Sequence, residues 1–375
     1  MRVTVVTTWL PTVVAPSSGS FVLRDCTAIR DAGAHLRIVH LVPPHQDDGT
    51  RHLVMNGIPV LRLPMAPASP LSVAGAARRL PSLLKGTDVL HSMAMSSLLP
   101  LSAADLAGRL TTPWVHTEHW SGLTNPGTLS APLRAGCLVI GQALRRPDVV
   151  TAVCEYLAEP IHHFRAEAPT LVVPCIVDPD GEAAPRRWEE RSDDGVIRLV
   201  TVGGLVERKD PLACLEIVAE LISRGEQATL TFVGEGPMRE QVTRRASELG
   251  IAEQVRLTGN LDAAGVREEL ARADLFLGPT RGDNFFVSAA ESIVAGRPVV
   301  VSDAGGQTEY VQETSGTIVP AGTSPAGWAQ AVLATRERLA RVSAAQVAAT
   351  IGDSFSSPVV GGSYHEVYAG LLAGA

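Results

Sequence analysis

Short runs of β-branched residues alternate with Ala- and Leu-rich helical runs along most of this chain. In the first half, strand-like runs occupy residues 3–8, 36–41, 88–92, 114–119, 149–153 and 171–174. The pattern starts again after residue 195, with runs at 196–204, 229–236, 255–260, 275–280 and 298–302. Strands that alternate with helices pair in parallel and are covered by helices on both faces. The sequence therefore predicts two α/β units, each built on a doubly wound parallel sheet.

The chain has 375 residues, which exceeds the usual size of a single domain. A polar segment with little hydrophobic periodicity separates the two patterned halves and is typical of a linker. We predict an N-terminal domain over residues 1–178, a linker over 179–195 and a C-terminal domain over 196–355. The amphipathic helix expected at about 356–375 should pack back on the N-terminal domain, where a further helix is expected at 141–146.

The bulk composition excludes several classes of protein. With 45% hydrophobic and 19% charged residues, the chain can build substantial cores. Its net charge of −7 argues against a general nucleic-acid binder. The five scattered cysteines are typical of free thiols in a reducing cytoplasm, and no apolar run reaches the roughly 20 residues that span a bilayer. We expect a cytoplasmic protein without a signal peptide; peripheral membrane contact through residues 76–85 stays open.

Two carboxylates in the second half, Asp283 and Glu291, lie eight positions apart around the expected start of a helix that Gly296 ends. Asp283 or Asn284 can cap this helix, which would leave the amides of residues 286–288 free to bind an anion. Eight helical rises correspond to about 12 Å, so the two acids would contact different ends of one extended ligand. Such a ligand would carry a phosphate flanked by hydroxyl-rich groups. The alternative is a helix cap followed by a solvated acid.

Glycine-rich turns follow the strands of the second half, at residues 203–204, 234–237, 259–260 and 305–309. Ligands of doubly wound sheets bind where the carboxyl ends of the strands meet, and glycines allow close backbone approach there. Arg208 and Lys209, just after the first of these turns, can pair with phosphate oxygens. A basic pair of this kind can also be a solvated helix start, but its position among the turns favours a phosphate site.

The same segments carry a family resemblance. Their order resembles the C-terminal domain of retaining glycosyltransferases of family 4: VGGLVERKD, FVGEGP, VRLTGNL and DLFLGPTRGDNFFVSAAESIVAGRPVVVSDAGGQTEYV. The resemblance covers about the last 180 residues strongly and the first 175 more loosely. It implies the GT-B architecture, in which two Rossmann-like domains face a central cleft. It also implies a nucleotide sugar as the donor.

The resemblance assigns roles to individual residues. Asp283 stands at the first position of a Glu-x7-Glu motif, near the donor sugar, and Glu291 stands at the second, which binds the ribose. Lys209 matches the lysine that contacts the diphosphate, whereas Gly204 stands where the family has an arginine. Either Arg208 supplies that charge from a different direction, or the phosphate binds through fewer charges. The donor-binding residues implied are Gly19, Gly204, Arg208, Lys209, Gly234, Asn284, Phe285, Phe286, Val287 and Glu291.

In the first half, residues 16–33 resemble the family's loop and helix after the first strand, in which Gly19 allows the loop to bend over the donor phosphate. Residues 112–122 resemble a strand that ends in an active-site histidine, and His119 occupies that place. A lone histidine is more often structural, which we expect of His91, but the strand-end position favours a site role for His119. The catalytic residues implied are His119, Asp283 and Lys209.

The reaction implied is transfer of a hexosyl group, of the glucose or N-acetylglucosamine type, with retention at the anomeric carbon. The expected donor is UDP-linked, and the expected acceptor is a hydroxyl of a small molecule, in natural-product or glycan biosynthesis. No cofactor is implied, and a metal is not required, because no Asp-x-Asp motif of the metal-dependent kind is evident in the sequence. The alternatives are a sugar-nucleotide-binding protein without catalysis and a GT-B sugar-nucleotide epimerase. A Rossmann oxidoreductase would need GxGxxG after a first strand, which neither half contains.

Overall fold

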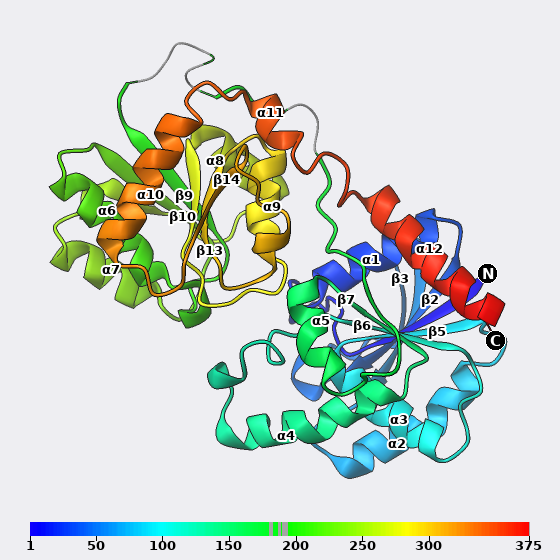
Figure 1. Ribbon diagram of the computed structural model, residues 1–375. Helices are drawn as coiled ribbons and strands as arrows, with labels where there is room; N and C mark the ends of the chain where they lie inside the picture. The colour runs from blue at the N-terminus through cyan, green and yellow to red at the C-terminus, as the bar shows by residue number, and fades with distance from the viewer. Residues whose placement is uncertain (180–182, 187–188, 190–193, 375) are drawn as a thin grey trace. The chain divides into compact units, whose positions relative to one another are not determined.

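The computed structural model describes residues 1–179, 183–186, 189 and 194–374 (Figure 1). The chain divides into two compact units. Unit 1 comprises Met1–Ile176 together with the segment from Phe355 onward, and unit 2 comprises Val177–Ser354. Most of the linker predicted over 179–195 lies outside the described residues. Within the described residues, no helix combines the length and the apolar character needed to cross a membrane.

Unit 1 is built on an eight-stranded sheet in the order β3-β4-β2-β1-β5-β6-β7-β8 (Figure 1). The strands are β1 Arg2–Thr7, β2 His35–Val42, β3 His52–Met55, β4 Ile58–Pro64, β5 Val89–Met93, β6 Trp114–Glu118, β7 Val149–Ala152 and β8 Thr170–Val172. Neighbouring strands pair in parallel, as predicted, except that β3 and β4 form an antiparallel hairpin. The turn of this hairpin, Asn56-Gly57, has positive φ at both residues, which is the geometry that lets two twisted strands join tightly.

The helices of unit 1 cover its sheet and include one from the end of the chain. They are α1 Ser20–Asp31, α2 Pro70–Leu83, α3 Leu98–Leu106, α4 Ala131–Gly141, α5 Glu155–His162 and α12 Ser357–Gly374. Helix α12 packs closely on α1, since a Cβ atom at Gly361 would lie 2.5 Å from the carbonyl oxygen of Ala28. The helix expected at 141–146 is a short 3-10 helix, Gln142–Arg145, which follows directly on α4.

A buried polar chain joins α12 to the sheet of unit 1. His91 contacts Tyr368 Oη through Nδ1 at 2.6 Å and Thr117 Oγ1 through Nε2 at 2.6 Å. Thr117 continues the chain to Thr151 Oγ1 at 2.6 Å. Burial lowers the pKa of His91 and raises that of Tyr368, which favours the neutral forms of both. These contacts give His91 the structural role expected from the sequence.

Unit 2 is built on a six-stranded sheet in the order β11-β10-β9-β12-β13-β14, in which every neighbouring pair is parallel. The strands are β9 Ile197–Val202, β10 Ala228–Val233, β11 Val255–Leu257, β12 Leu275–Gly278, β13 Val299–Ser302 and β14 Gly316–Val319. The helices are α6 Pro211–Ser223, α7 Arg239–Glu248, α8 Ala263–Arg272, α9 Val287–Val294, α10 Pro325–Arg338 and α11 Ala344–Ala348 (Figure 1). The two predicted parallel α/β units are therefore confirmed.

The glycine-rich turns of unit 2 follow the carboxyl ends of its parallel strands, as predicted. Two isolated β-bridges tie neighbouring turns together, one from Gly234 to Gly259 and one from Asp283 to Gly305. A Cβ atom at Gly234 would lie 2.1 Å from the carbonyl oxygen of Gly203, so the turns after β9 and β10 meet backbone to backbone. This edge of the sheet therefore holds the predicted site residues of unit 2.

Candidate functional site

Both cations predicted after β9 converge on one carboxylate oxygen. Arg208 and Lys209 lie in a short 3-10 turn, Glu207–Lys209, and Asp210 then caps α6 by accepting the amide of Ala213 at 3.4 Å. Arg208 Nη1 lies 2.7 Å and Lys209 Nζ lies 2.6 Å from Asp283 Oδ2. The sequence predicted these residues at the carboxyl ends of strands in one sheet, and the structure brings them into direct contact.

The backbone of Asp283 is held by the neighbouring turn after β13. Its amide donates to Ala304 O at 3.2 Å, and Gly306 N donates to Asn284 O at 2.9 Å. Because these bonds keep residues 283 and 284 attached to that turn, the helix cannot begin there. The predicted cap at Asp283 or Asn284 is therefore wrong: α9 begins at Val287, and only the second half of the interval from Asp283 to Glu291 is helical.

Phe286 is the N-cap of α9, in a left-handed conformation with φ 59° that is uncommon for an aromatic residue. Its carbonyl accepts from Tyr310 Oη at 2.8 Å, and its amide donates to Asp283 Oδ1 at 3.2 Å. The amide of Phe286, expected to be free, is thus engaged. The ring packs edge-on against Phe276 and lies under Lys209 Nζ, which is 3.9 Å from the ring centroid. Phe286 therefore positions both the helix start and the lysine.

The amides of Val287 and Ser288 precede the first hydrogen bond within α9, which Ala289 N donates to Phe286 O at 2.9 Å. Such first-turn amides have no acceptor within their own helix and favour an anion. The Ser288 hydroxyl donates to Val202 O at 2.9 Å and so fixes the helix start against the end of β9. Two cations and a helix amino end are thereby gathered at one point of the sheet edge.

The remaining donor-site candidates of unit 2 lie around this cluster. Glu291 is half-buried on α9, and its negative charge opposes the lowering of the Lys209 pKa by burial. Asn284 and Phe285 are buried, and the Phe285 ring packs against Tyr310 at 5.3 Å between centroids. The side chain of Phe285 therefore packs inside unit 2. Gly204 has open surroundings, since a Cβ atom there would be 3.5 Å from its nearest neighbour, the carbonyl oxygen of Glu235.

Electrostatics bias the Asp283 carboxylate toward its charged form. Its burial raises the pKa, but Lys209 and Arg208 outweigh that effect and hold the pKa at about 2, below the ordinary value of 3.8. The Lys209 ammonium has a lowered pKa because of its burial, and the Asp283 carboxylate opposes this shift. The cluster is therefore a half-buried arrangement of one carboxylate and two cations, and a bound anion would change its charge balance.

This shift predicts a pH dependence of stability. A carboxyl whose pKa is lower in the folded than in the unfolded state stabilises the fold above the unfolded value, and that contribution is lost as pH falls through the folded value. We expect the contribution of Asp283 to the free energy of unfolding to fall by about 2 kcal/mol as pH falls from about 5 to about 2. Urea unfolding at a series of pH values measures it. Asp283→Asn should lack this part of the dependence, and an unchanged profile would contradict the shift.

In unit 1, His119 follows β6 directly and lies against α1. Its Nε2 is 3.4 Å from Asp25 Oδ2, and its ring is tilted against Phe21 at 4.7 Å between centroids. Glu118 is fully buried, and its Oε1 accepts the amides of His119 at 2.9 Å and Trp120 at 2.7 Å. These contacts orient the backbone that carries His119.

Asp25 was missed by the sequence reasoning, although a signal exists. It lies on the buried face of α1 with Val22, Cys26 and Ile29, and an acid in the middle of an apolar stripe implies a polar partner. Gly19, the N-cap of α1, has φ 63°, and a Cβ atom there would lie 2.3 Å from the carbonyl carbon of Trp9. Glycine at this position is therefore required by the close approach of the loop's two ends.

Comparison with known proteins gives a separate match for each unit. Residues 197–337 match the family model described as glycosyl transferases group 1, and residues 18–175 match the glycosyl transferase 4-like domain. Among solved structures, sucrose-phosphate synthase from Thermosynechococcus elongatus covers all of both chains with a TM-score of 0.78 at 18% identity. Anabaena HepE in complex with UDP covers 99% of this chain and 100% of its own, with a TM-score of 0.77 at 17% identity. At these identities the likeness shows the fold, which is GT-B.

Curated relatives share parts of the sequence. The 2-deoxystreptamine glucosyltransferase of Streptomyces kanamyceticus is 28% identical over 60% of this chain and 62% of its own. A GDP-mannose-dependent phosphatidylinositol monomannoside mannosyltransferase of Mycolicibacterium smegmatis is 35% identical over 38% and 39%. The D-inositol 3-phosphate glycosyltransferase of Geodermatophilus obscurus is 28% identical over 62% and 56%. The chain thus spans less than two thirds of the length of each of these relatives. Because these family models match both of its units, the chain belongs to the group 1 glycosyltransferases, which are similar to glycosyltransferase family 4.

Proposed function

We propose that this protein transfers a hexosyl group, of the glucose or N-acetylglucosamine type, from a nucleoside diphosphate sugar to a hydroxyl of a small-molecule acceptor, with retention. One observation carries the proposal: Arg208, Lys209 and the first amides of α9 meet at the carboxyl edge of a parallel sheet. That combination binds a diphosphate. The expected nucleotide is UDP, and the transfer as proposed uses no metal.

The chemistry assigned to these groups follows from the bond that breaks. As the anomeric C–O bond to the diphosphate breaks, its electron pair moves to the departing phosphate oxygen. Cations and aligned amides stabilise that developing charge, and they act strongly in a partly buried site. The acceptor oxygen forms the new bond on the same face, and its proton passes to the phosphate oxygen. In this proposal His119, held by Asp25, orients the sugar and the acceptor without becoming a nucleophile.

The names of two relatives support a small hydroxylated acceptor, whereas a third is named for a phosphatidylinositol monomannoside, and the names leave two donor classes to compare. Two relatives are named for glycosyl transfer to 2-deoxystreptamine and D-inositol 3-phosphate, and one is named as GDP-mannose-dependent. Solved HepE structures contain UDP and UDP-glucose. Thermal-shift measurements with UDP, GDP, ADP and TDP should therefore come first, followed by transfer assays with the matching sugars and a panel of cyclitol acceptors. Stabilisation by GDP alone would overturn the UDP assignment.

A protein that binds a sugar nucleotide without turnover is the second candidate. It is favoured by Gly204, where the family has an arginine, and by Asp283, whose carboxylate already contacts both cations. The two candidates differ in one measurement. Release of free sugar or transfer to any acceptor supports the enzyme, whereas binding without either product for every donor supports the silent protein.

Glu291 is assigned to the ribose, which gives a separate prediction. Glu291→Gln should weaken binding of UDP itself about 10-fold, because the ribose hydroxyls would then donate to a neutral amide oxygen in place of a charged carboxylate, and the amide nitrogen cannot accept a hydrogen bond. Isothermal titration with UDP measures the change. Glu220→Gln is the matched control, since this glutamate pairs with Arg224 on the exposed surface of α6. Equal UDP affinity in the wild type and Glu291→Gln would remove the ribose role.

A further inference from the structure

The segment between β1 and α1 in unit 1, residues 8–19, is called the β1–α1 loop here. Two sets of contacts within the loop hold it together. Its ends meet where Gly19 packs against the main chain of Trp9. Its middle is closed by a tight turn, in which Thr12 N donates to Ala15 O at 3.2 Å and Ala15 N donates to Thr12 Oγ1 at 3.1 Å. The loop therefore has an internal frame.

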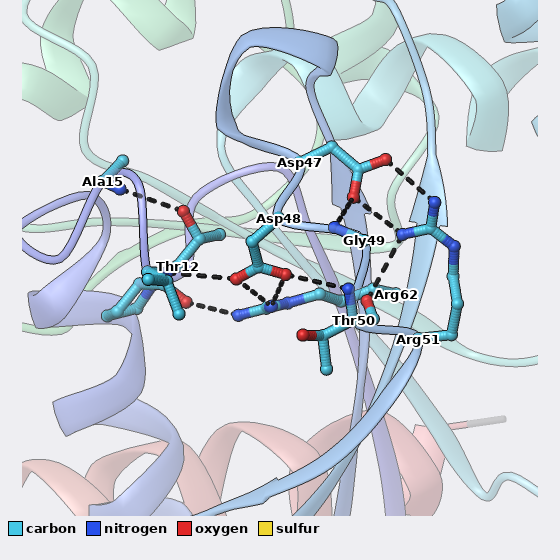
Figure 2. A network of polar contacts seen from close by, with 10 residues as sticks. Thr12, Ala15, Asp47, Asp48, Gly49, Thr50, Arg51 and Arg62 are labelled. Carbon is cyan, nitrogen blue, oxygen red and sulfur yellow. Dashed lines mark hydrogen bonds and ion pairs between the residues drawn. The ribbon is translucent and has the colours of Figure 1, made fainter.

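A buried ion pair outside the loop holds its backbone (Figure 2). Arg62 of β4 donates from Nη1 to both carboxylate oxygens of Asp48, at 2.9 and 2.8 Å. The two side chains are only 3% and 8% exposed. From the same pair, Arg62 Nη2 donates to Pro11 O at 2.7 Å, and Asp48 Oδ2 accepts the amide of Val13 at 3.1 Å. Each partner thus grips one point of the loop.

The contribution of the Arg62–Asp48 ion pair to stability depends on the backbone groups that it binds. A buried ion pair is weak support for stability by itself, because desolvation offsets the attraction. Here the charges are satisfied by backbone groups, since Asp48 also accepts the amide of Thr50 at 3.0 Å. The amides of Val13 and Thr50 are the main reasons that the pKa of Asp48 lies well below its usual range. Removing the carboxylate would leave Arg62 buried without this counter-ion and release the Val13 amide.

The held backbone presents apolar side chains and adjoins the His119 cluster. Val13 is 85% and Val14 is 63% exposed. At the start of the loop, Trp9 packs edge-on against Phe21 at 5.7 Å, and Phe21 packs against His119 at 4.7 Å. A shift of the loop would therefore displace the Phe21 ring, against which His119 packs.

We propose that the β1–α1 loop is preorganised before any ligand binds, and that Asp48 and Arg62 are positioning residues that hold it for the acceptor side of the reaction. A loop locked in this way needs no ligand to order it, in contrast to a loop that closes over the donor. The positioning role rests on the proposed function; the preorganisation does not.

Hydrogen exchange of the full chain without ligand tests the preorganisation. In the wild type, peptides covering residues 8–19 should be protected, and Asp48→Ala should raise their exchange rates about 10-fold or more. Asp47→Ala is the matched control, because this neighbouring acid contacts Gly49 and Arg51 (Figure 2). Fast exchange in the wild type that slows only when UDP-glucose is added would overturn the proposal, because the loop would then be a lid.

Arg62→Lys supplies a second variant if Asp48→Ala does not fold. It keeps a cation for Asp48 but loses the fork that also reaches Pro11, so exchange should rise at residues 8–12. In transfer assays both variants should raise the acceptor KM about 10-fold, which is a larger effect than any loss of affinity for UDP through Gly19. A looser loop with unchanged acceptor KM would remove the positioning role. If no donor is turned over by any form, the proposed function fails while the exchange data still decide the preorganisation.

Discussion

Arg208→Ala is expected to lower the turnover number about 100- to 1,000-fold. Arg208 Nη1 lies 2.7 Å from Asp283 Oδ2 and also donates to Gly282 O at 2.9 Å, which holds the guanidinium at the edge where the diphosphate is proposed to bind. Removing it leaves Lys209 as the one cation of the predicted pair. Steady-state assays with saturating donor measure the loss, which should fall mainly on kcat because the charge develops in the transition state.

Gly204→Arg should restore a large part of that turnover in the Arg208→Ala background. The resemblance places an arginine at position 204, and the structure leaves room for one. A Cβ atom at Gly204 would be 3.5 Å from Glu235 O and 3.7 Å from Val206 Cγ1, which is ordinary contact, and its φ is not in the left-handed region. The two positions would thus be alternative sources of the same charge.

The matched control for both variants is Arg281→Ala. Arg281 lies close in sequence to Asp283 but pairs with Asp210 at 2.7 Å and with Glu207 at 3.4 Å. Its loss should change turnover only a few fold, as an exposed ion pair contributes little. Full turnover in Arg208→Ala, with no effect of Gly204→Arg, would mean that Lys209 and the helix amides bind the diphosphate alone.

The sheets of both units were predictable because their strands are short, buried and rich in β-branched residues, so periodicity and composition agree. The elements that were missed lie where those signals are weak. The β3–β4 hairpin has an Asn56-Gly57 turn, which is a strong local signal for an antiparallel pair inside a chain whose strands otherwise alternate with helices. Helix α4 begins at Ala131, within a stretch whose loop-like composition concealed it.

The candidate site was predictable to the level of which residues share the sheet edge, because carboxyl ends of parallel strands meet. Its internal geometry was not. The sequence suggested that Asp283 caps α9, but the cap is Phe286, since the bridge from Asp283 to Gly305 delays the helix. Likewise, Asp25 is distant in sequence from His119, and only the packing of α1 beside the end of β6 brings them together. Such tertiary contacts override local propensity.

Asp283→Asn should have opposite effects on the binding of the diphosphate and on the transfer of the sugar. In the structure Asp283 Oδ2 contacts both Arg208 and Lys209, so the carboxylate occupies the charges that a diphosphate would use. Neutralising it should leave the two cations facing each other and raise the affinity for UDP about 10-fold. The resemblance places Asp283 near the donor sugar, so the same change also removes an anionic acceptor for the sugar hydroxyls, and transfer should fall about 100-fold or more.

Titration with UDP and with UDP-glucose, alongside transfer assays, measures both effects of Asp283→Asn on one protein. The gain should appear for UDP and shrink for UDP-glucose, because only the sugar nucleotide loses a contact. Asp303→Asn is the control: this acid, just beyond β13, accepts the amide of Ala321 at 2.7 Å and should leave both affinities unchanged. Weaker UDP binding in Asp283→Asn would show that the carboxylate orders the cations for the diphosphate, and the competition argued from the 2.7 and 2.6 Å contacts would be wrong.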